Sequence, residues 1–200
     1  MKYLFVCPMQ DTFRISAADV KGGRELYGTL RFQTYTPPQM PLLPYVPAYF
    51  QQMQEQPKPL RQFFREYIRG FLPKQCLLVL HDDATDLEAG ALSDLLAACG
   101  IKDVPMEYRA FLLSSEPAYV AVTGSKRAVT VTRISADSDE TERIFIPLNE
   151  AVPETVSEAV GELDPDGRLP VYTFGVPERL ASVGEEIFEP ELFRNFIRIL

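Results

Sequence analysis

Several kinds of site are excluded by what this 200-residue sequence has little of. It contains one histidine and three cysteines, Cys7, Cys76 and Cys99, and no two cysteines form a C-x-x-C pair. Because tetrahedral zinc sites draw their ligands from clustered cysteine and histidine, a zinc site is hard to build from this supply. The odd number of cysteines and their apolar surroundings instead predict buried, reduced thiols in a cytoplasmic protein.

Positive charge is also scarce. The sequence has 20 lysines and arginines against 28 aspartates and glutamates, a formal net charge of -8. Phosphate backbones and acidic lipid surfaces repel such a protein, so we expect no nucleic-acid binding. Long apolar runs are missing too, and the run at the N-terminus is too short for a secretory signal. We therefore expect no membrane insertion and a cytoplasmic location.

The motifs of common hydrolases are absent as well. No G-x-S-x-G elbow occurs, and His81 would have to be the only base for a serine or cysteine nucleophile. A ribonuclease H-type nuclease needs a carboxylate within its first strand to help hold two metal ions. The first apolar run, Lys2–Cys7, has none, although Glu66 and Asp82 suit other positions. We predict no catalytic residue, no metal ligand and no cofactor.

What the sequence does have is one strongly marked unit, residues 76–100. A continuous apolar run over Cys76–Leu80 is typical of a strand buried on both faces. Thr85 and Glu88 have the spacing of a capping box, which predicts that a helix begins there. Gly100 supplies the left-handed residue that ends such a helix. With 46% hydrophobic residues in the chain, this unit predicts the centre of a packed α/β layer.

The charged residues after this strand are candidates for binding. His81, Asp82 and Asp83 follow its carboxyl end, where α/β proteins often place ligands. Asp82 and Asp83 equally suit the start of the following helix, because carboxylates there face the positive end of its dipole. The structural interpretation is favoured. Asp82 is kept as a candidate binding residue, and a nucleotide-binding protein or hydrolase with a site near His81 and Asp82 is the alternative function.

The rest of the first half completes a recognisable order of elements. Three strands joined by short turns predict an antiparallel meander, and a helix begins near Pro59. The predicted strands are Lys2–Cys7, Thr12–Ala17, Glu25–Tyr35 and, after the marked unit, Tyr108–Leu113. A meander followed by helix, strand, helix and strand is the succession of the ribonuclease H-like fold.

Prolines recur every three residues between the meander and the first helix. Pro38, Pro41, Pro44 and Pro47 have the period of a polyproline II helix. The segment is either a ligand for a polyproline-reading partner or a stiff strap that lies on the core. We favour the strap, because recognition segments are usually more polar and lie in disordered tails.

The outer face of the first helix carries a basic row. Arg61, Arg65 and Arg69 follow one another at steps of four. Like charges at that spacing repel slightly, so the row does not serve helix stability. It either forms a solvated face balanced by nearby acids such as Glu66, which we favour, or docks a partner that bears carboxylates.

The second half repeats the order of the first. Hairpin strands flank the turn at residues 124–127, and a third strand, a helix and a further strand follow. The predicted elements are strands Tyr119–Thr123, Ala128–Ile134, Arg143–Leu148 and Leu169–Phe174, helices Pro153–Val160 and Pro177–Ser182, an edge strand Ile187–Phe188 and a closing apolar helix Pro190–Leu200. We predict an α/β protein of two small ribonuclease H-like lobes, residues 1–115 and 116–200. One continuous α+β domain is the alternative.

Between the halves, Glu116-Pro117-Ala118 resembles the Glu-Pro junction between the lobes of actin-like and heat-shock chaperone ATPases. The resemblance places the first phosphate loop, D-x-G-x-T, on residues 8–12, where Asp11 and Thr12 stand without a glycine. It places the second, D-x-G-G-x-T, on residues 123–127, which hold one glycine and no aspartate, and the adenosine loop on 174–177, which has one glycine. Glycines let amides approach phosphate and the carboxylates hold magnesium through water, so ATP hydrolysis is not expected.

These observations predict a pseudoenzyme of actin-like ATPase type, a non-catalytic binding or scaffold module that acts through protein–protein interaction. The candidate binding residues are Arg61, Arg65, Arg69, Asp11 and Asp82. Either a protein partner or self-association is expected, the latter through the apolar closing helix.

Overall fold

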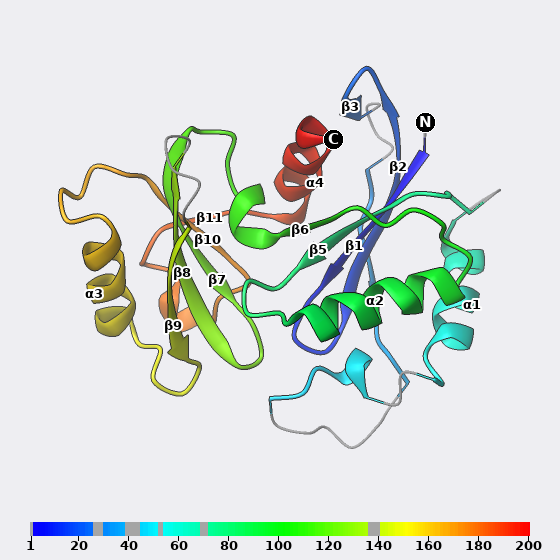
Figure 1. Ribbon diagram of the computed structural model, residues 1–200, viewed down its shortest axis with the longest axis horizontal. Helices are drawn as coiled ribbons and strands as arrows, with labels where there is room; N and C mark the ends of the chain where they lie inside the picture. The colour runs from blue at the N-terminus through cyan, green and yellow to red at the C-terminus, as the bar shows by residue number, and fades with distance from the viewer. Residues whose placement is uncertain (1, 26–29, 39–44, 52–53, 69–71, 136–140) are drawn as a thin grey trace. The chain divides into compact units, whose positions relative to one another are not determined.

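The structure is a computed structural model that describes residues 2–25, 30–38, 45–51, 54–68, 72–135 and 141–200. The chain divides into two compact units, each built around one sheet (Figure 1). The first unit comprises Met1–Leu80, Ala84–Glu107 and Phe196–Leu200, and the second comprises His81–Asp83 and Tyr108–Asn195.

The sheet of the first unit has six strands in the order β3-β2-β1-β5-β6, with β4 also paired to β2. The strands are β1 (Lys2–Pro8), β2 (Phe13–Lys21), β3 (Arg24–Glu25), β4 (Gln33–Tyr35), β5 (Cys76–Leu80) and β6 (Met106–Tyr108). β1 pairs antiparallel with β2 and parallel with β5. All five residues of β5 are buried, which confirms the prediction of a strand covered on both faces.

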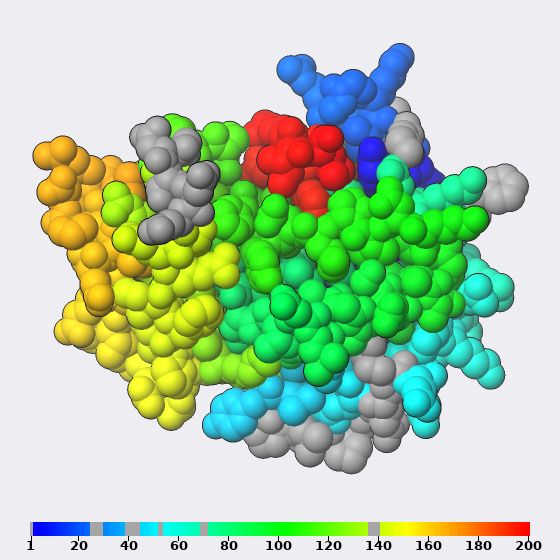
Figure 2. Space-filling view, in the orientation of Figure 1, coloured from blue at the N-terminus to red at the C-terminus, as the bar shows by residue number. Residues whose placement is uncertain are grey.

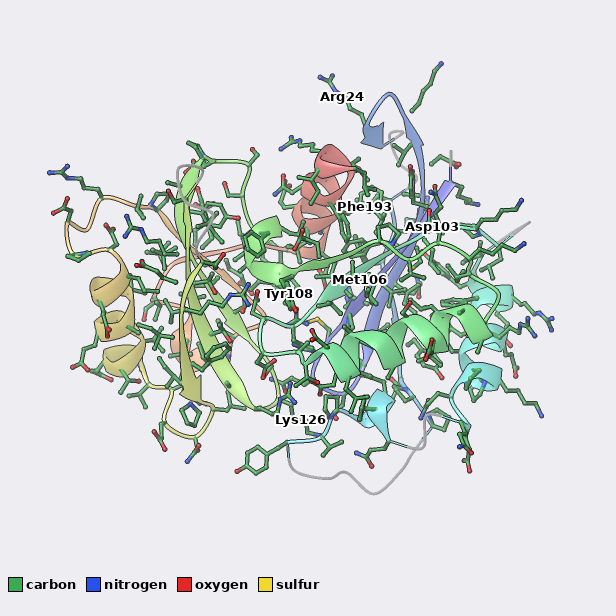
Figure 3. All side chains as sticks on the ribbon, in the orientation of Figure 1. Arg24, Asp103, Met106, Tyr108, Lys126 and Phe193 are labelled. Atoms are coloured by element: carbon green, nitrogen blue, oxygen red, sulfur yellow. The ribbon has the colours of Figure 1, made fainter. Side chains whose placement is uncertain are left out.

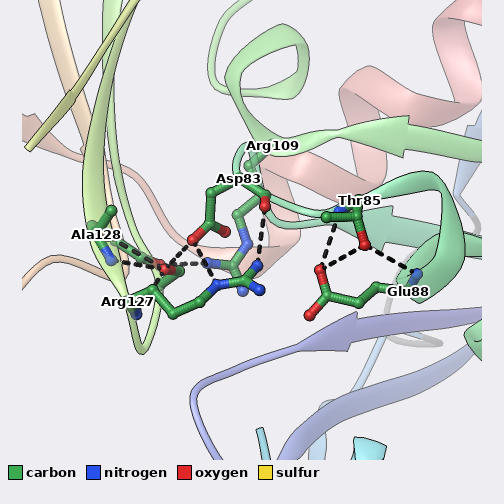
Figure 4. Close-up of polar contacts among 8 residues, drawn as sticks. Asp83, Thr85, Glu88, Arg109, Arg127 and Ala128 are labelled. Atoms are coloured by element: carbon green, nitrogen blue, oxygen red, sulfur yellow. Dashed lines mark hydrogen bonds and ion pairs between the residues drawn. The ribbon is translucent and has the colours of Figure 1, made fainter. Parts of the chain in front are cut away.

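The described helical segments that lie wholly within this unit are η1 (Ala48–Phe50), α1 (Pro57–Tyr67) and α2 (Asp86–Ala98). The capping box at the start of α2 is confirmed: Thr85 Oγ1 accepts from the Glu88 amide at 3.2 Å, and the Glu88 carboxylate accepts from the Thr85 amide at 2.9 Å (Figure 4). At the other end Gly100 has φ +101°, and its amide donates to the carbonyl of Ala97 at 2.9 Å. The local signals at both ends of α2 therefore predicted its limits well.

The sheet of the second unit has five strands in the order β11-β10-β7-β8-β9. The strands are β7 (Ala118–Gly124), β8 (Ala128–Ser135), β9 (Glu142–Pro147), β10 (Val171–Phe174) and β11 (Glu185–Glu186). The helical segments of the second half are η2 (Arg109–Leu112), α3 (Pro153–Leu163), η3 (Glu178–Leu180) and α4 (Glu189–Ile199). Val120, Val122, Val129 and Val131 of the central strands pack with residues of α3 to form the core of this unit.

The two sheets follow one plan. In each, an antiparallel meander begins with a strand that also pairs in parallel with the strand following a helix: β1 with β5, and β7 with β10. The predicted α/β class, with two mixed sheets, a meander in each and flanking helices, is confirmed. A division into domains at residues 115 and 116 stays a prediction.

The third strand of the first meander is shorter than predicted. Glu25–Tyr35 is not one strand, because β3 and β4 pair with the two ends of β2 in different registers. Val20 faces Glu25, and the same register would set Phe13 against Phe32, but Phe13 faces Tyr35, three residues later. The segment is too long to pair continuously with β2. Residues 26–29 lie outside the described part of the chain.

Three other predicted elements differ. Tyr108–Leu113 is not a strand: β6 ends at Tyr108, and the 3-10 helix η2 follows because side chains satisfy the backbone of Ala110. The predicted helix Pro177–Ser182 is reduced to η3. The edge strand lies at Glu185–Glu186 instead of Ile187–Phe188.

Candidate functional site

The two turns to which the resemblance assigns phosphate loops occupy equivalent places in the two sheets. One joins β1 to β2 and the other joins β7 to β8. In the first turn, the amide of Met9 donates to the carbonyl of Thr12 at 2.7 Å. The carboxylate of Asp11 accepts from the amide of Ala48 at 3.2 Å, which ties this turn to η1. The structure thus gives Asp11 a structural contact, and its predicted binding role stays a prediction.

The second turn is organised around Ser125. Its hydroxyl oxygen accepts from the amides of Arg127 and Ala128, each at 3.0 Å. A serine that accepts from amides two and three residues ahead stabilises a tight turn, which explains how the three residues 125–127 connect β7 to β8. The same hydroxyl donates to Asp83 Oδ2 at 2.6 Å.

Asp83 also forms an ion pair with Arg127 of this turn. Arg127 Nε lies 3.1 Å from Asp83 Oδ2, and Arg127 Nη2 donates to the backbone carbonyl of Asp83 at 2.8 Å (Figure 4). The Asp83 side chain is only 9% exposed, so the pair is partly shielded from water. Ser125 and Arg127 of this turn therefore both bind a carboxylate of this chain.

Asp82 is buried and binds different groups from those that Asp83 binds. Its carboxylate accepts from the Thr123 hydroxyl at 2.6 Å and from the Ala110 amide at 3.0 Å. Burial raises the pKa of the Asp82 carboxyl above its usual value, while these two hydrogen bonds and the guanidinium groups of Arg109 and Arg143 lower it. His81 is also buried. The two residues of the alternative site thus lie inside the protein.

Arg109 is a residue that sequence reasoning missed. It is 1% exposed, its Nη1 donates to the carbonyl of Gly124 at 2.6 Å, and its guanidinium carbon lies 5.2 Å from the centre of the Phe174 ring. A buried guanidinium near Asp82 offsets part of the cost of burying that carboxylate. No local pattern identifies such a residue, because its partners are distant in the sequence.

The ends of β7 and β10 are packed backbone to backbone. A Cβ atom on Gly124 would lie 2.2 Å from the carbonyl oxygen of Gly175, in the loop to which the resemblance assigns adenosine binding. Gly175 itself has φ +65°, a conformation that favours glycine. The two glycines therefore serve close packing within the second unit.

The basic row on α1 is only partly a solvated face. Arg61 Nε donates to the carbonyl of Cys99 at 3.3 Å, at the end of α2, where a cation suits the negative end of the helix dipole. Arg65 is exposed. Arg69 lies outside the described residues. The structure thus places Arg61 and Arg65 together and leaves their predicted binding role untested.

The described residues also bear on metal binding, on the cysteines and on membrane insertion. Nowhere in ranges 2–25, 30–38, 45–51, 54–68, 72–135 and 141–200 do three His, Cys, Asp or Glu side chains cluster closely enough to hold a metal ion. Cys7, Cys76 and Cys99 are buried, as predicted, and form no disulfide among the described residues, and burial raises the pKa of Cys99 to about 11. Of the helices in these ranges, none has the length and apolar character needed to cross a bilayer.

No protein-family model matches the sequence, and no curated protein matches it either. Solved structures do match. The ethanolamine utilization protein EutJ from Carboxydothermus hydrogenoformans is 11% identical, with a TM-score of 0.61 over 98% of this chain and 88% of EutJ. A Bacteroides thetaiotaomicron protein described as having an actin-like ATPase fold and unknown function is 7% identical, with a TM-score of 0.52 over 98% of this chain and 95% of its own.

The chain has the actin-like ATPase fold. The predicted resemblance to this superfamily, and with it the ribonuclease H-like class, is confirmed at the level of the fold. The cytoplasmic domain of EpsL, an inner membrane component of the type II secretion system of Vibrio cholerae, shares it: identity is 10% and the TM-score 0.53, over 99% of this chain and 94% of that domain.

Side chains of both turns bind other parts of this chain. The β1–β2 turn uses Asp11 to bind η1, and the β7–β8 turn uses Ser125 and Arg127 to bind Asp83. Sequence reasoning detected the missing glycines of both loops. It did not detect the intrachain carboxylate that the second turn binds.

Proposed function

We propose that this chain is a non-catalytic protein-binding or scaffold module, a pseudoenzyme built on the actin-like ATPase fold. The observation that carries the proposal is the contact of Asp83 with Ser125 and Arg127. A phosphate at this turn would have to displace a carboxylate that is 9% exposed and held by both a hydroxyl and a guanidinium. The absence of the loop glycines adds to this cost, because the side chains that stand in their place keep phosphate away from the backbone amides.

The interaction part of the proposal has separate support. Arg61 and Arg65 form an exposed basic surface in a chain with a net charge of -8, and such a surface suits a partner that bears carboxylates. The EpsL domain of the same fold is described as belonging to a component of a secretion system, so the fold occurs in a protein that is part of a larger system. Three buried free thiols favour a reducing, cytoplasmic setting.

The alternative is a nucleotide-binding protein or hydrolase with a site near His81 and Asp82. A raised pKa is typical of catalytic carboxyl groups. Yet both Asp82 oxygens accept hydrogen bonds from the protein, and the residue is 4% exposed. Buried groups satisfied in this way serve the fold, so this alternative has less support.

Titration calorimetry with ATP and magnesium tests the proposal. We expect no saturable heat with the wild-type protein up to millimolar ATP, and no phosphate release. The matched variant is Arg127→Ala, which removes the cation that a phosphate would need. Micromolar ATP binding by the wild type that Arg127→Ala abolishes would overturn the proposal and restore a nucleotide site at this turn.

A further inference from the structure

A groove in the first unit runs between α1 and the carboxyl-terminal end of α2. One part has a volume of about 320 Å³ and is lined by Arg61, Phe64, Arg65, Ile68, Leu72 and Cys99. An adjoining part of about 430 Å³ shares Arg61 and Arg65 and extends to Lys58, at the start of α1. Figure 2 shows the surface over these helices, with α1 in cyan next to α2 in green.

The rim of this groove is positively charged without a balancing carboxylate. Lys58, Arg61 and Arg65 are exposed, and none of the described residues that line the groove is acidic. Within the described part of the chain, Lys58 and Arg65 make no hydrogen bond or ion pair through their side chains, and Arg61 binds only the carbonyl of Cys99. Lys58 and Arg65 thus lie on one face of an acidic protein without a partner among the described residues, and such cations favour an anionic occupant.

The floor of the groove is apolar. Phe64 is 1% exposed and Ile68 4% exposed, so both belong to the core, while Leu72 is half-buried beside them. Gly100 also lines the groove, and its φ of +101° is a backbone conformation that favours glycine. Leu72 and the methylene stems of the rim cations therefore give an occupant apolar surface to contact, in addition to the charge of the rim.

Magnitudes indicate why charge alone is not sufficient. An exposed ion pair contributes about 0–1 kcal/mol, so three of them give at most about 3 kcal/mol, too little for stable binding. Each leucine-sized side chain that is buried adds about 1.5–3 kcal/mol. A segment with both kinds of side chain gains from both terms, and free phosphate or a purely acidic tail does not.

The spacing of the cations indicates the conformation of the occupant. Lys58, Arg61 and Arg65 are three and four residues apart on α1, so they span about 10 Å along the helix. A second helix lying alongside places carboxylates at the same intervals if they too are three and four residues apart. An apolar stripe on its adjacent positions then faces the groove floor.

Helix α3 of this chain is acidic but does not fit this description. Glu154, Glu158 and Glu162 are exposed on α3 at suitable steps, but Ser157 and Gly161 are the exposed residues between them. That face has no exposed apolar side chain for the groove, so α3 of a second copy would gain only the weak ionic term.

We propose that the groove between α1 and α2 binds an acidic amphipathic helix of a partner protein, with Lys58, Arg61 and Arg65 as the charged contacts. This inference rests on the proposed function as an interaction module and names the chemistry of the partner. The cations and the apolar contacts both contribute to binding, so its affinity falls with rising salt without vanishing.

The test uses a fluorescent designed helix of about 14 residues, the length at which isolated helices begin to form. It carries glutamates three and four residues apart and a leucine stripe beside them. One control peptide replaces the leucines with serine, and another replaces the glutamates with lysine. We expect the full chain to bind the acidic leucine peptide at least about tenfold more tightly than either control, the change that 1.4 kcal/mol represents.

Two variants of equal charge change locate the binding site. Lys58→Glu with Arg65→Glu reverses two rim cations and keeps Arg61, which also contacts α2. Lys21→Glu with Arg24→Glu makes the same change at the exposed β2–β3 turn of the same unit (Figure 3). We expect the first pair to weaken peptide binding by about tenfold or more and the second by about twofold or less, since two specific pairs are lost only in the first.

Other outcomes overturn the inference. Equal binding of all three peptides, or unchanged binding by the Lys58 and Arg65 variant, would show that the groove is not the site. Self-association abolished by that variant would assign the groove to a second copy, and binding to anionic lipid vesicles instead of peptide would assign it to a membrane. No peptide binding together with no ATP binding would refute the groove alone. Micromolar ATP binding would refute the proposed function whatever the peptide does.

Discussion

Charged side chains are used in opposite ways in two regions of this protein. At the β7–β8 turn, Asp83 and Arg127 pair with each other, and Asp82 is buried under the Thr123 hydroxyl and a backbone amide. In the α1–α2 groove, Lys58 and Arg65 have no such partner within the described residues. Charges that satisfy each other stabilise one conformation, whereas charges left in solvent are available to another molecule. The comparison predicts that substitutions cost stability at the turn and binding at the groove.

Removing the buried carboxylate is expected to have the largest effect. Asp82→Ala leaves the Thr123 hydroxyl and the Ala110 amide without their acceptor in a buried place. We expect the free energy of unfolding to fall by about 3 kcal/mol, since hydrogen bonds to charged groups contribute about 1.5–3 kcal/mol each and are not additive. Urea denaturation measures the change.

Asp82→Asn is the matched control. Its amide oxygen accepts from Ala110 while its amino group donates to the Thr123 oxygen, so both contacts survive without a buried charge. We expect a loss within about 1 kcal/mol. Equal losses in the two variants would mean that the charge, and not the hydrogen bonds, stabilises this region.

Packing around the turn is tested by Gly124→Ala. The new methyl group would lie 2.2 Å from the carbonyl oxygen of Gly175, so the ends of β7 and β10 must separate. We expect a loss of about 2 kcal/mol, within the usual range for overpacking. Gly161→Ala on α3 is the control: no atom lies within 4 Å of its new methyl group. There we expect a gain of about 0.5–1 kcal/mol from helix propensity, measured in the same denaturation experiment.

The contact between Asp83 and Arg127 is tested by a double-mutant cycle. Side-chain exposures of 9% and 31% put this pair between a buried and a surface ion pair. We expect Asp83→Ala and Arg127→Ala to show a coupling energy of about 1 kcal/mol at low salt, decreasing as salt rises. A coupling energy of zero would leave the turn free to accept another anion and would weaken the proposed function.

The pH dependence of stability tests the role of the buried Asp82 carboxyl. Because burial raises the pKa of Asp82 above 3.8, the folded state binds its proton more tightly than the unfolded state. The contribution of this carboxyl to the free energy of unfolding is fully present below pH 3.8 and is lost as the pH rises through the folded-state pKa. Going from about pH 7 to about pH 4, wild type should gain stability relative to Asp82→Asn. If the wild type instead lost stability relative to Asp82→Asn over this range, the pKa of Asp82 would be lowered in the folded state and not raised.

The smallest effect on stability is expected at the groove. Lys58→Glu with Arg65→Glu changes exposed side chains that hold no other group of the described structure. We expect the free energy of unfolding to change by no more than about 0.5 kcal/mol, as for ordinary surface substitutions. A loss as large as that of Asp82→Ala would end the distinction between the two regions.

Much of the fold was predictable because its signals are local. The capping box of Thr85 and Glu88 and the terminating Gly100 depend on residues a few positions apart, and they marked α2 correctly. The buried strand β5 and the hairpin of β7 and β8 follow from apolar patterns of the same short range. These elements, in this order, already indicated the actin-like fold.

What only the tertiary structure decided depends on partners far apart in the chain. Asp82 meets Ala110 at a separation of 28 residues and Thr123 at 41, and Asp83 meets Arg127 at 44. From the sequence, both aspartates suited the start of a helix equally well, because that position needs no distant partner. Likewise, the spacing of Arg61 and Arg65 is visible in the sequence. Only the packing of α1 against α2 places the two arginines beside apolar side chains. Local patterns determine elements, and the packing of those elements determines which charges are satisfied and which are left for a partner.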